Sequence, residues 1–142
     1  MRSVRELLGD KSQVLYTVGA DDPVRTAIER MAEHHIGALP VVRGSELAGI
    51  VSERDYARKV VLLGRNSRET AVCQIMSSPV ITVSPDDRAR HCMELMTEKR
   101  IRHLPVLENG VLVGMISIGD CVRAVIAAQQ QEIDELKRYI TS

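Results

Sequence analysis

The stretch Gly49-Ile50-Val51-Ser52-Glu53-Arg54-Asp55 decides the fold, and it returns 65 residues later as Gly114-Met115-Ile116-Ser117-Ile118-Gly119-Asp120. In both copies an apolar run ends in Ser, with Asp three residues on, which predicts a strand that leads into a helix. Such a helix start attracts anions, because its unpaired N–H groups and the helix dipole both favour negative charge. The Asp offers an acceptor for a pair of hydroxyl groups such as a ribose diol. The alternative is that Ser and Asp only form a capping box.

The two copies belong to a longer internal duplication. Residues 17–61 and 82–126 pair at a constant offset of 65, with 18 identities in 45 positions and no gap. Each copy predicts a β-α-β-β-α unit, with a short strand, a helix that begins at an Asp pair, a hairpin and a second helix. One such unit is too small to cover both faces of its sheet. We therefore expect an α+β fold in which the two repeats pack sheet to sheet around a pseudo-two-fold axis.

The duplication sets the predicted domain boundaries. They are an N-terminal turn or short helix at 1–14, the first repeat at 15–64, a connector at 65–79, the second repeat at 80–127 and a helical tail at 128–142. In the tail Ile126, Ile133 and Ile140 recur every seven residues with Leu136 between them. This spacing indicates a short heptad seam that glutamines 129–131 interrupt. The tail is interpreted either as a helix on the protein's own surface or as a contact with a second subunit.

The composition argues against several classes of protein. Nineteen basic residues balance nineteen acidic ones, and the chain has no Trp or Phe. It therefore lacks both the charge and the stacking platform of a nucleic-acid-binding protein. No apolar run approaches the ~20 residues of a membrane span, and the N-terminus lacks the apolar region of a signal peptide. Cys73, Cys92 and Cys121 sit singly, which is typical of reduced core cysteines. We expect a cytoplasmic protein without nucleic-acid or membrane partners.

The sequence carries no recognisable catalytic or metal-binding pattern. Neither Gly-x-Gly-x-x-Gly after a strand nor Gly-x-x-x-x-Gly-Lys occurs, so Rossmann and P-loop chemistry have no support. The four His show no ligand spacing with Cys or carboxylate, and we expect no metal site. Cys121 beside Asp120 could be a reactive thiol, but a buried structural Cys is the favoured interpretation. We expect no catalytic residue, no catalytic cofactor and no enzymatic activity.

The repeated Gly-hydrophobic-hydrophobic-Ser-x-x-Asp, with Leu-Pro-Val upstream in each copy, resembles a tandem CBS-domain pair, also called a Bateman module. The resemblance covers residues 14–126 and extends to small stand-alone bacterial proteins of this type. It implies a non-catalytic regulatory module of signal transduction that binds adenosine-containing ligands in clefts between the repeats and signals through conformation or dimerisation. AMP is the expected ligand, with ADP, ATP, NAD(H) and S-adenosylmethionine as related ones. The alternative function is a ligand-independent, dimeric protein-interaction module.

The resemblance also assigns ligand-binding residues, and each site is shared between the repeats. In the first site Asp120 is the ribose acceptor and Ser117 a phosphate contact, together with Thr17, Gly37, Ala38, Pro40 and Gly119. In the second site Asp55 and Ser52 take these roles, together with Arg54, Thr82, Arg102, His103 and Pro105. Arg102 and His103 stand where the first repeat has Gly37 and Ala38. They are interpreted either as phosphate contacts or as bulk that narrows the second adenine slot.

The helix faces of the repeats lead us to expect a homodimer. Both first helices carry apolar residues at helical spacing, among them Val24, Ile28, Met93 and Met96. Apolar surface that remains after the repeats pack needs a cover, because soluble monomers rarely expose large apolar patches. The family resemblance also points to paired modules.

Overall fold

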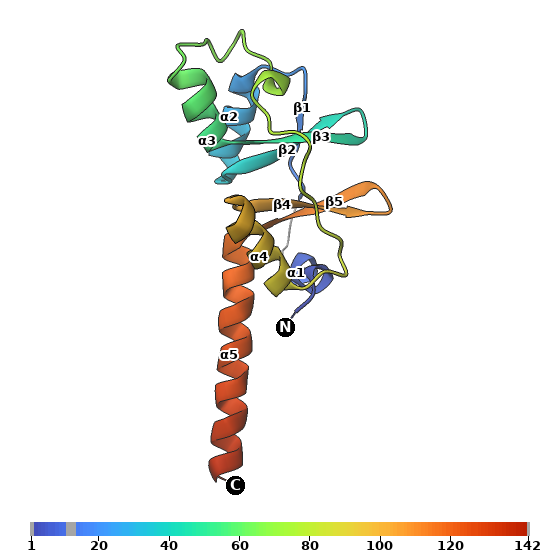
Figure 1. Ribbon diagram of the computed structural model, residues 1–142, viewed down its shortest axis with the longest axis vertical. Helices are drawn as coiled ribbons and strands as arrows, with labels where there is room; N and C mark the ends of the chain where they lie inside the picture. The colour runs from blue at the N-terminus through green and yellow to red at the C-terminus, as the bar shows by residue number, and fades with distance from the viewer. Residues whose placement is uncertain (1, 11–13, 142) are drawn as a thin grey trace. The chain divides into compact units, whose positions relative to one another are not determined.

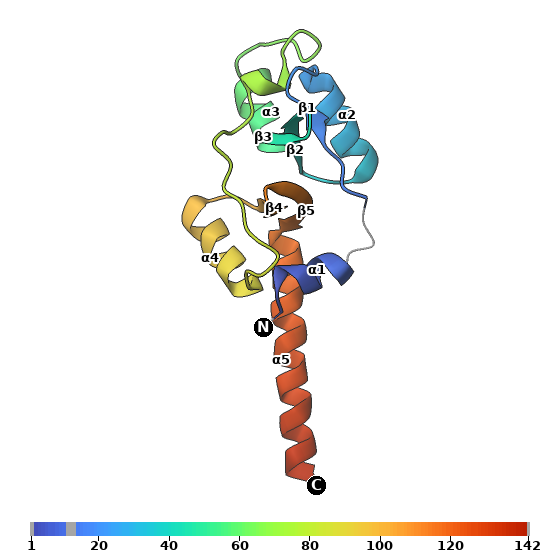
Figure 2. The same ribbon diagram turned by 90° about the vertical axis from the view of Figure 1, so that its right-hand side faces the viewer.

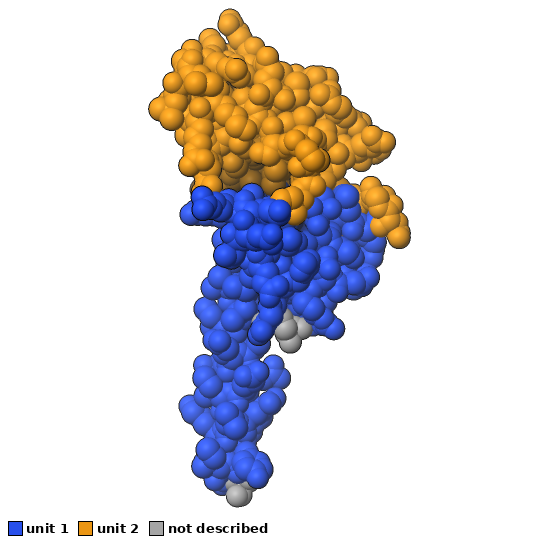
Figure 3. Space-filling model, in the orientation of Figure 1, with its two compact units in different colours: residues 1–13, 82–108, 114–142 blue, residues 14–81, 109–113 orange. Residues whose placement is uncertain are grey.

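The computed structural model describes residues 2–10 and 14–141 and divides the chain into two compact units (Figure 3). Unit 1 comprises residues 1–13, 82–108 and 114–142, and unit 2 comprises residues 14–81 and 109–113. Unit 2 therefore holds the first repeat and the segment that follows it. Unit 1 combines the second repeat with the N-terminal segment, which the linear boundaries predicted from the sequence do not group together.

Unit 2 is built on a three-stranded sheet in the order β1-β2-β3 (Figure 1). Its elements are β1 (Val18–Gly19), α2 (Val24–His34), β2 (Ala38–Arg43), β3 (Glu46–Ser52), α3 (Glu53–Tyr56), the π-helical turn η1 (Ala57–Val61) and the 3₁₀ turn η2 (Val72–Gln74). β2 and β3 form an antiparallel hairpin in which Ala38 lies opposite Ser52, and β1 pairs with β2 in parallel. Ala27 and Met31 on the buried face of α2 join the strand residue Leu39 in one core.

Unit 1 follows the same plan with fewer strand pairs. Its elements are α1 (Val4–Asp10), α4 (Ala89–Lys99), β4 (His103–Glu108), β5 (Val111–Ser117) and α5 (Ile118–Thr141). β4 and β5 form a two-stranded sheet. Val83 adds a single parallel bridge to Val106 at the place where the first repeat has β1. The buried face of α4 has the same spacing as that of α2 and consists of Ala89, Cys92 and Met96.

In unit 2 the segment that leads into η2 caps the start of α2. The Val24 N–H donates to the Thr70 carbonyl at 2.8 Å, and the Val72 N–H donates to the Asp22 carbonyl at 2.9 Å. These bonds satisfy a donor that would otherwise be left unpaired at the helix N-terminus. A segment that the sequence presents as a connector is therefore part of the first repeat's packing.

In unit 1 the N-terminal segment has the equivalent position. The Ala89 N–H donates to the Arg2 carbonyl at 3.0 Å, and the Val4 N–H donates to the Asp87 carbonyl at 2.8 Å. A salt bridge of 2.6 Å between Arg5 and Glu108 further connects α1 to β4. The segment that precedes each repeat in the sequence thus packs against the core of the other repeat.

The first glycine of each repeated stretch makes room for these leading segments. A Cβ atom on Gly49 would lie 2.9 Å from the Ser77 carbonyl oxygen and also against the Met76 side chain. A Cβ atom on Gly114 would lie 2.6 Å from Cδ2 of Leu8. Glycine is required at both positions because another chain segment approaches the strand closely.

The α+β class predicted from the sequence is confirmed, and both hairpins lie where the repeats place them. The second helix of the first repeat differs from the expectation of one helix from Ser52 to about Leu63, because α3 gives way to η1 after Tyr56. The prediction of exposed apolar helix faces is wrong for Val24 and Met96, which are buried in their own units.

The remaining members of that set, Ile28 and Met93, are half-buried. Among the described helices, none combines the length and the apolar character that crossing a membrane requires.

Candidate functional site

The Ser-x-x-Asp motif of the first repeat forms a capping box at the start of α3. The Ser52 N–H donates to Asp55 Oδ2 at 2.9 Å, and the Asp55 N–H donates to Ser52 Oγ at 3.2 Å. Lys59, one turn further on, places its Nζ 3.0 Å from the other carboxylate oxygen of Asp55. The same ammonium group donates to the Ile75 carbonyl at 2.8 Å. The Asp55 carboxylate is therefore held at both oxygens and has its charge balanced.

The second repeat builds the same box at the start of α5. The Ser117 N–H donates to Asp120 Oδ2 at 2.8 Å, and the Asp120 N–H donates to Ser117 Oγ at 3.2 Å. The Arg123 Nη2 donates to Asp120 Oδ1 at 2.7 Å. The Asp120 side chain is only 5% exposed, whereas that of Arg123 is 73% exposed. A buried carboxylate thus carries its counter-ion on the surface.

Both helix starts are also tied to the strand before them. The Glu53 N–H donates to the Gly37 carbonyl at 3.0 Å, and the Ile118 N–H donates to the Arg102 carbonyl at 2.9 Å. With the bonds to the Ser hydroxyls, two of the first three N–H groups of each helix have partners within the chain. The expectation of a helix start with its first N–H groups open to an anion is corrected accordingly, since capping already satisfies most of them.

The sequence-predicted site residues fall into two groups, one in each unit. Gly37 and Ala38 lie beside Ser52 and Asp55 in unit 2, because Ala38 is the strand partner of Ser52. In unit 1, β4 begins at His103, directly after Arg102, and β5 ends at Ser117, just before Asp120. Each predicted site takes residues from both units, so the geometry concerns the half that each unit supplies.

The remaining predicted residues of unit 2 flank its sheet. Thr17 is half-buried just before β1, and its carbonyl accepts a hydrogen bond from the Arg30 guanidinium. The neighbouring Tyr16 ring stacks on His34 with 3.6 Å between the ring centroids. Pro40 is buried on β2, whereas Arg54 is exposed at the start of α3.

Those of unit 1 have comparable positions. Thr82 is half-buried next to Val83, whose N–H donates to the carbonyl of the buried Pro105 at 3.1 Å. Arg102 is exposed and His103 is half-buried. Gly119 follows Ser117 on α5, and a Cβ atom there would lie 3.4 Å from an Arg123 guanidinium nitrogen. Arg123 therefore covers the helix start closely.

The sequence analysis missed two cations, Lys59 and Arg123. Both lie three or four residues after an Asp on a helix, which is the spacing at which opposite charges meet. That spacing could have identified them.

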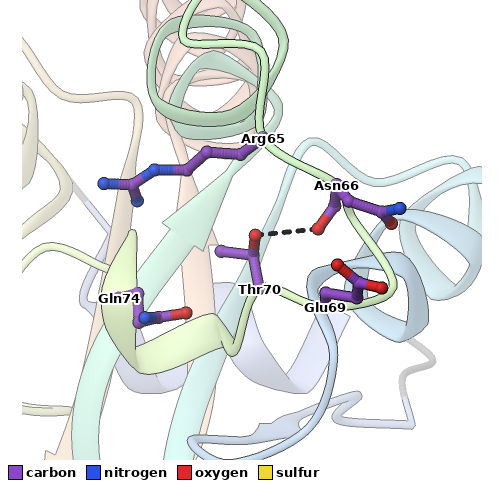
Figure 4. A pocket seen from close by; sticks show the side chains of 5 residues that line it. All are labelled: Arg65, Asn66, Glu69, Thr70 and Gln74. Atoms are coloured by element: carbon purple, nitrogen blue, oxygen red, sulfur yellow. Dashed lines mark hydrogen bonds between the residues drawn. The ribbon is translucent and has the colours of Figure 1, made fainter.

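It also missed a polar hollow of about 320 Å³ in unit 2, lined by Arg65, Asn66, Glu69, Thr70 and Gln74 (Figure 4). The buried Thr70 hydroxyl there donates to the Asn66 carbonyl at 2.8 Å. The hollow lies in the segment that caps α2, outside the residues assigned to either site.

Two cysteines meet where α4 and α5 pack. Cys92 and Cys121 are both fully buried free thiols, while Cys73 is partly exposed. A hydrogen bond with Cys121, together with burial, raises the pKa of the Cys92 thiol well above its ordinary range. A thiol that keeps its proton is a poor nucleophile. Both residues thus have the surroundings of structural core cysteines.

Among the described residues, no three His, Cys, Asp or Glu side chains are grouped so that they could hold a metal ion. The candidate chemistry therefore rests on the two boxes. Each offers a fixed carboxylate beside a cation at the end of a hairpin.

Comparison with known proteins agrees with this arrangement. The model of the CBS domain matches residues 4–62 and 72–127. A protein with CBS domains from Burkholderia ambifaria has a solved structure that is 53% identical, with a TM-score of 0.86 over 90% of this chain and 96% of that one. A hexameric CBS-CP12 protein from bloom-forming cyanobacteria is 28% identical, with a TM-score of 0.76 over 85% of this chain and 70% of that one.

Among curated proteins, the mitochondrial CBS domain-containing protein CBSX3 of Arabidopsis thaliana is 46% identical over 125 residues. The match covers 84% of this chain and 61% of that protein, so the chain spans less than two thirds of its length. Two family matches in tandem account for both repeats and for both Ser-x-x-Asp boxes. The chain belongs to the CBS-domain family and carries a tandem pair of CBS domains.

Proposed function

We propose that this CBS pair, a regulatory module, is a non-catalytic sensor of an adenine nucleotide. AMP is the proposed ligand, with ADP, ATP or NAD(H) as related candidates. The observation that carries the proposal is the duplicated box, in which a fixed carboxylate stands beside a cation in each repeat. A nucleotide presents hydroxyl donors and an anionic phosphate close together, and these match a carboxylate and a cation respectively.

The second repeat offers the stronger version of this pairing. Asp120 is buried and held by the Ser117 N–H, so its carboxylate is already positioned before a ligand arrives. Arg123 is largely exposed, and it can reorient toward a phosphate at little packing cost. A ribose hydroxyl that reached Asp120 would take a charge-assisted hydrogen bond, which is stronger than a neutral one.

A second candidate function is a ligand-independent interaction module. The same observation favours it, because both boxes are complete and both carboxylates are paired within the chain. In this case Asp55 and Asp120 serve only to start helices. The two functions differ in whether a nucleotide binds at all.

Self-association is also part of the proposal. The CBS-CP12 relative is described as hexameric, which supports assembly of this chain as well. In unit 1 a groove of about 530 Å³ runs along α4 and α5 and carries the half-buried Met93 and Val125. A homodimer could use this apolar strip, although Val24 and Met96 are unable to contribute.

Calorimetry with AMP tests the nucleotide proposal. Asp120→Ala should weaken binding by about 1.5–3 kcal/mol, the usual worth of a hydrogen bond to a charged group. Asp87→Ala is the matched control, because Asp87 accepts from the Ser84 N–H at 2.7 Å just as Asp120 accepts from the Ser117 N–H. The control should lose a similar bond without losing affinity.

A second titration compares AMP with adenosine. If Arg123 contacts the phosphate, AMP should bind more tightly than adenosine, and rising salt should reduce the difference. Equal affinity of the wild type and Asp120→Ala, or no heat with any adenine nucleotide, would leave the interaction module as the function.

A further inference from the structure

The distal half of α5 carries an apolar stripe without a partner in the described chain. α5 runs from Ile118 to Thr141, and Figures 1 and 2 both show it continuing far past the other elements of unit 1. Every residue from 129 to 141 is exposed. The apolar side chains among them include Ile133 at 45%, Leu136 at 61% and Ile140 at 78% exposure. The tail therefore does not lie on its own chain's surface.

The stripe follows a heptad pattern over the whole exposed part of the helix. Positions spaced by alternating steps of four and three residues are Val122, Ile126, Gln129, Ile133, Leu136 and Ile140. The β-branched isoleucines 126, 133 and 140 occupy the a positions, and residues 122, 129 and 136 occupy the d positions. Isoleucine at a with leucine at d favours two parallel strands over three or four.

The charges beside the stripe specify the same partner. In this register Glu132 occupies a g position and Lys137 the following e position. In a parallel, in-register pair the g residue of one helix faces the next e residue of the other, so Glu132 meets Lys137 of the second copy twice. In an antiparallel pair g faces g and e faces e, and these opposite charges would not meet.

We infer that the stripe defined by residues 122, 126, 129, 133, 136 and 140 docks on a second copy of this chain as a parallel, two-stranded coiled coil. A helix of about 13 residues is only marginally stable alone in water, and packing of an apolar face supplies the rest. Gln129 at a d position opposes its own copy, and this polar layer sets the register at some cost in stability. The inference specifies the self-association proposed above and does not depend on nucleotide sensing.

Disulfide trapping tests the contact directly. In the proposed pair, residue 129 faces its own copy, whereas residue 131 points outward at an f position. Gln129→Cys should therefore form a linked dimer under copper phenanthroline in air at least about ten times faster than Gln131→Cys, since only the former holds its thiols together. The wild type supplies the background from its own three cysteines.

Charge reversal in the Gln129→Cys chain tests the orientation. Glu132→Lys opposes Lys137 of the second copy and should slow the trapping about tenfold, because two attractive pairs become repulsive. Adding Lys137→Glu should restore the original rate. Glu135→Lys makes the same charge change at an outward c position and should have no effect. These residues are all exposed in the single chain, so the fold tolerates the changes.

Each outcome decides the inference. Equal trapping rates for Gln129→Cys and Gln131→Cys would overturn the coiled coil. Fast trapping that Glu132→Lys leaves unchanged would overturn the parallel register. A nucleotide-induced rise in melting temperature that persists in either case would show that the sensing function stands without the coil.

Discussion

The second helices of the two repeats start alike and continue differently. In the first repeat α3 turns into η1, where the Leu62 N–H donates to the Ala57 carbonyl five residues back at 3.0 Å. In the second repeat α5 continues as one regular helix. The cation that pairs with the capping Asp is Lys59, four residues on, in the first case and Arg123, three residues on, in the second. The repeat alignment instead places Arg58 opposite Arg123.

This difference shows that the carboxylate, and not one particular cation, is what the two repeats share. Any basic residue three or four positions further on lies on the same helix face as the Asp. Lys59 spends part of its hydrogen bonding on the Ile75 carbonyl and so fastens the helix to η2. Arg123 fastens nothing else among the printed contacts and faces solvent. The first box is therefore the more structural one, and the second is better suited to respond to a ligand.

The largest expected difference between the repeats concerns their close-approach glycines. Gly49→Ala should lower the free energy of unfolding by about 1–3 kcal/mol, as overpacking usually does. The new methyl group would meet the Ser77 carbonyl, which is fixed by its hydrogen bond of 3.1 Å from the Ile50 N–H. Gly114→Ala should cost less, because it meets only the end of the Leu8 side chain, which can rotate away. Urea denaturation of both variants measures the two costs.

A double variant provides the control for this prediction. Leu8→Ala should remove the clash in Gly114→Ala, so that the two changes are strongly non-additive. Equal costs for the two glycine variants would contradict the proposed difference between a fixed carbonyl and a rotatable side chain.

The next difference concerns alkaline pH. The second repeat has Cys92 where the first has Ala27, and the pKa of the Cys92 thiol is raised by its bond with Cys121 and by burial. Above about pH 8.5 the unfolded thiol ionises while the native one keeps its proton, so the unfolded state is favoured. The free energy of unfolding should then fall by up to about 1.4 kcal/mol per pH unit because of this group alone.

Cys92→Ala, which imposes the first repeat's residue on the second, isolates that contribution. Urea denaturation between pH 7.5 and 10, values chosen to bracket about 8.5, should give a shallower decline for the variant than for the wild type. Lysines and tyrosines titrate equally in both proteins and cancel in the difference. Parallel curves would show that the thiol is not protected.

The smallest expected effect separates the two cations. Lys59→Met keeps the alkyl stem but loses the bonds to Asp55 and Ile75, and it should destabilise by about 1 kcal/mol. Arg123→Met loses a pair whose cation is 73% exposed, and it should cost no more than about 0.5 kcal/mol. Thermal unfolding of the two methionine variants, side by side, measures the contrast. A larger loss for Arg123→Met would reverse the roles assigned to the two boxes.

The local parts of this structure could be predicted from the sequence. Ser52 with Asp55, and Ser117 with Asp120, have capping-box spacing, and the structure confirms the box at both places. The hairpins follow from apolar strands on either side of a turn. These features depend on residues close together in the chain, where spacing determines geometry.

The position of the leading segments could not be predicted in this way. Val4 and Val72 have equivalent hydrogen bonds, but they are 68 residues apart, whereas the gap-free alignment holds at an offset of 65. Their partners, Asp87 and Asp22, lie in the repeat that each segment does not precede. No local pattern encodes that choice. The π-helical turn escaped prediction for a similar reason, since its cause is the tie from Lys59 to the distant Ile75.

The exchange of leading segments makes unit 2 an insertion within unit 1. The continuous part Val14–Ile81 begins and ends at residues whose neighbours, α1 on one side and Val83 with α4 on the other, belong to unit 1. While unit 1 stays folded, an unfolded unit 2 is a closed loop with fewer conformations than a free chain of the same length. By analogy with a disulfide that closes a loop of this size, the restriction favours folded unit 2 by about 4 kcal/mol. The first CBS domain thereby gains stability from the chain's connectivity that the same residues, excised, would lack.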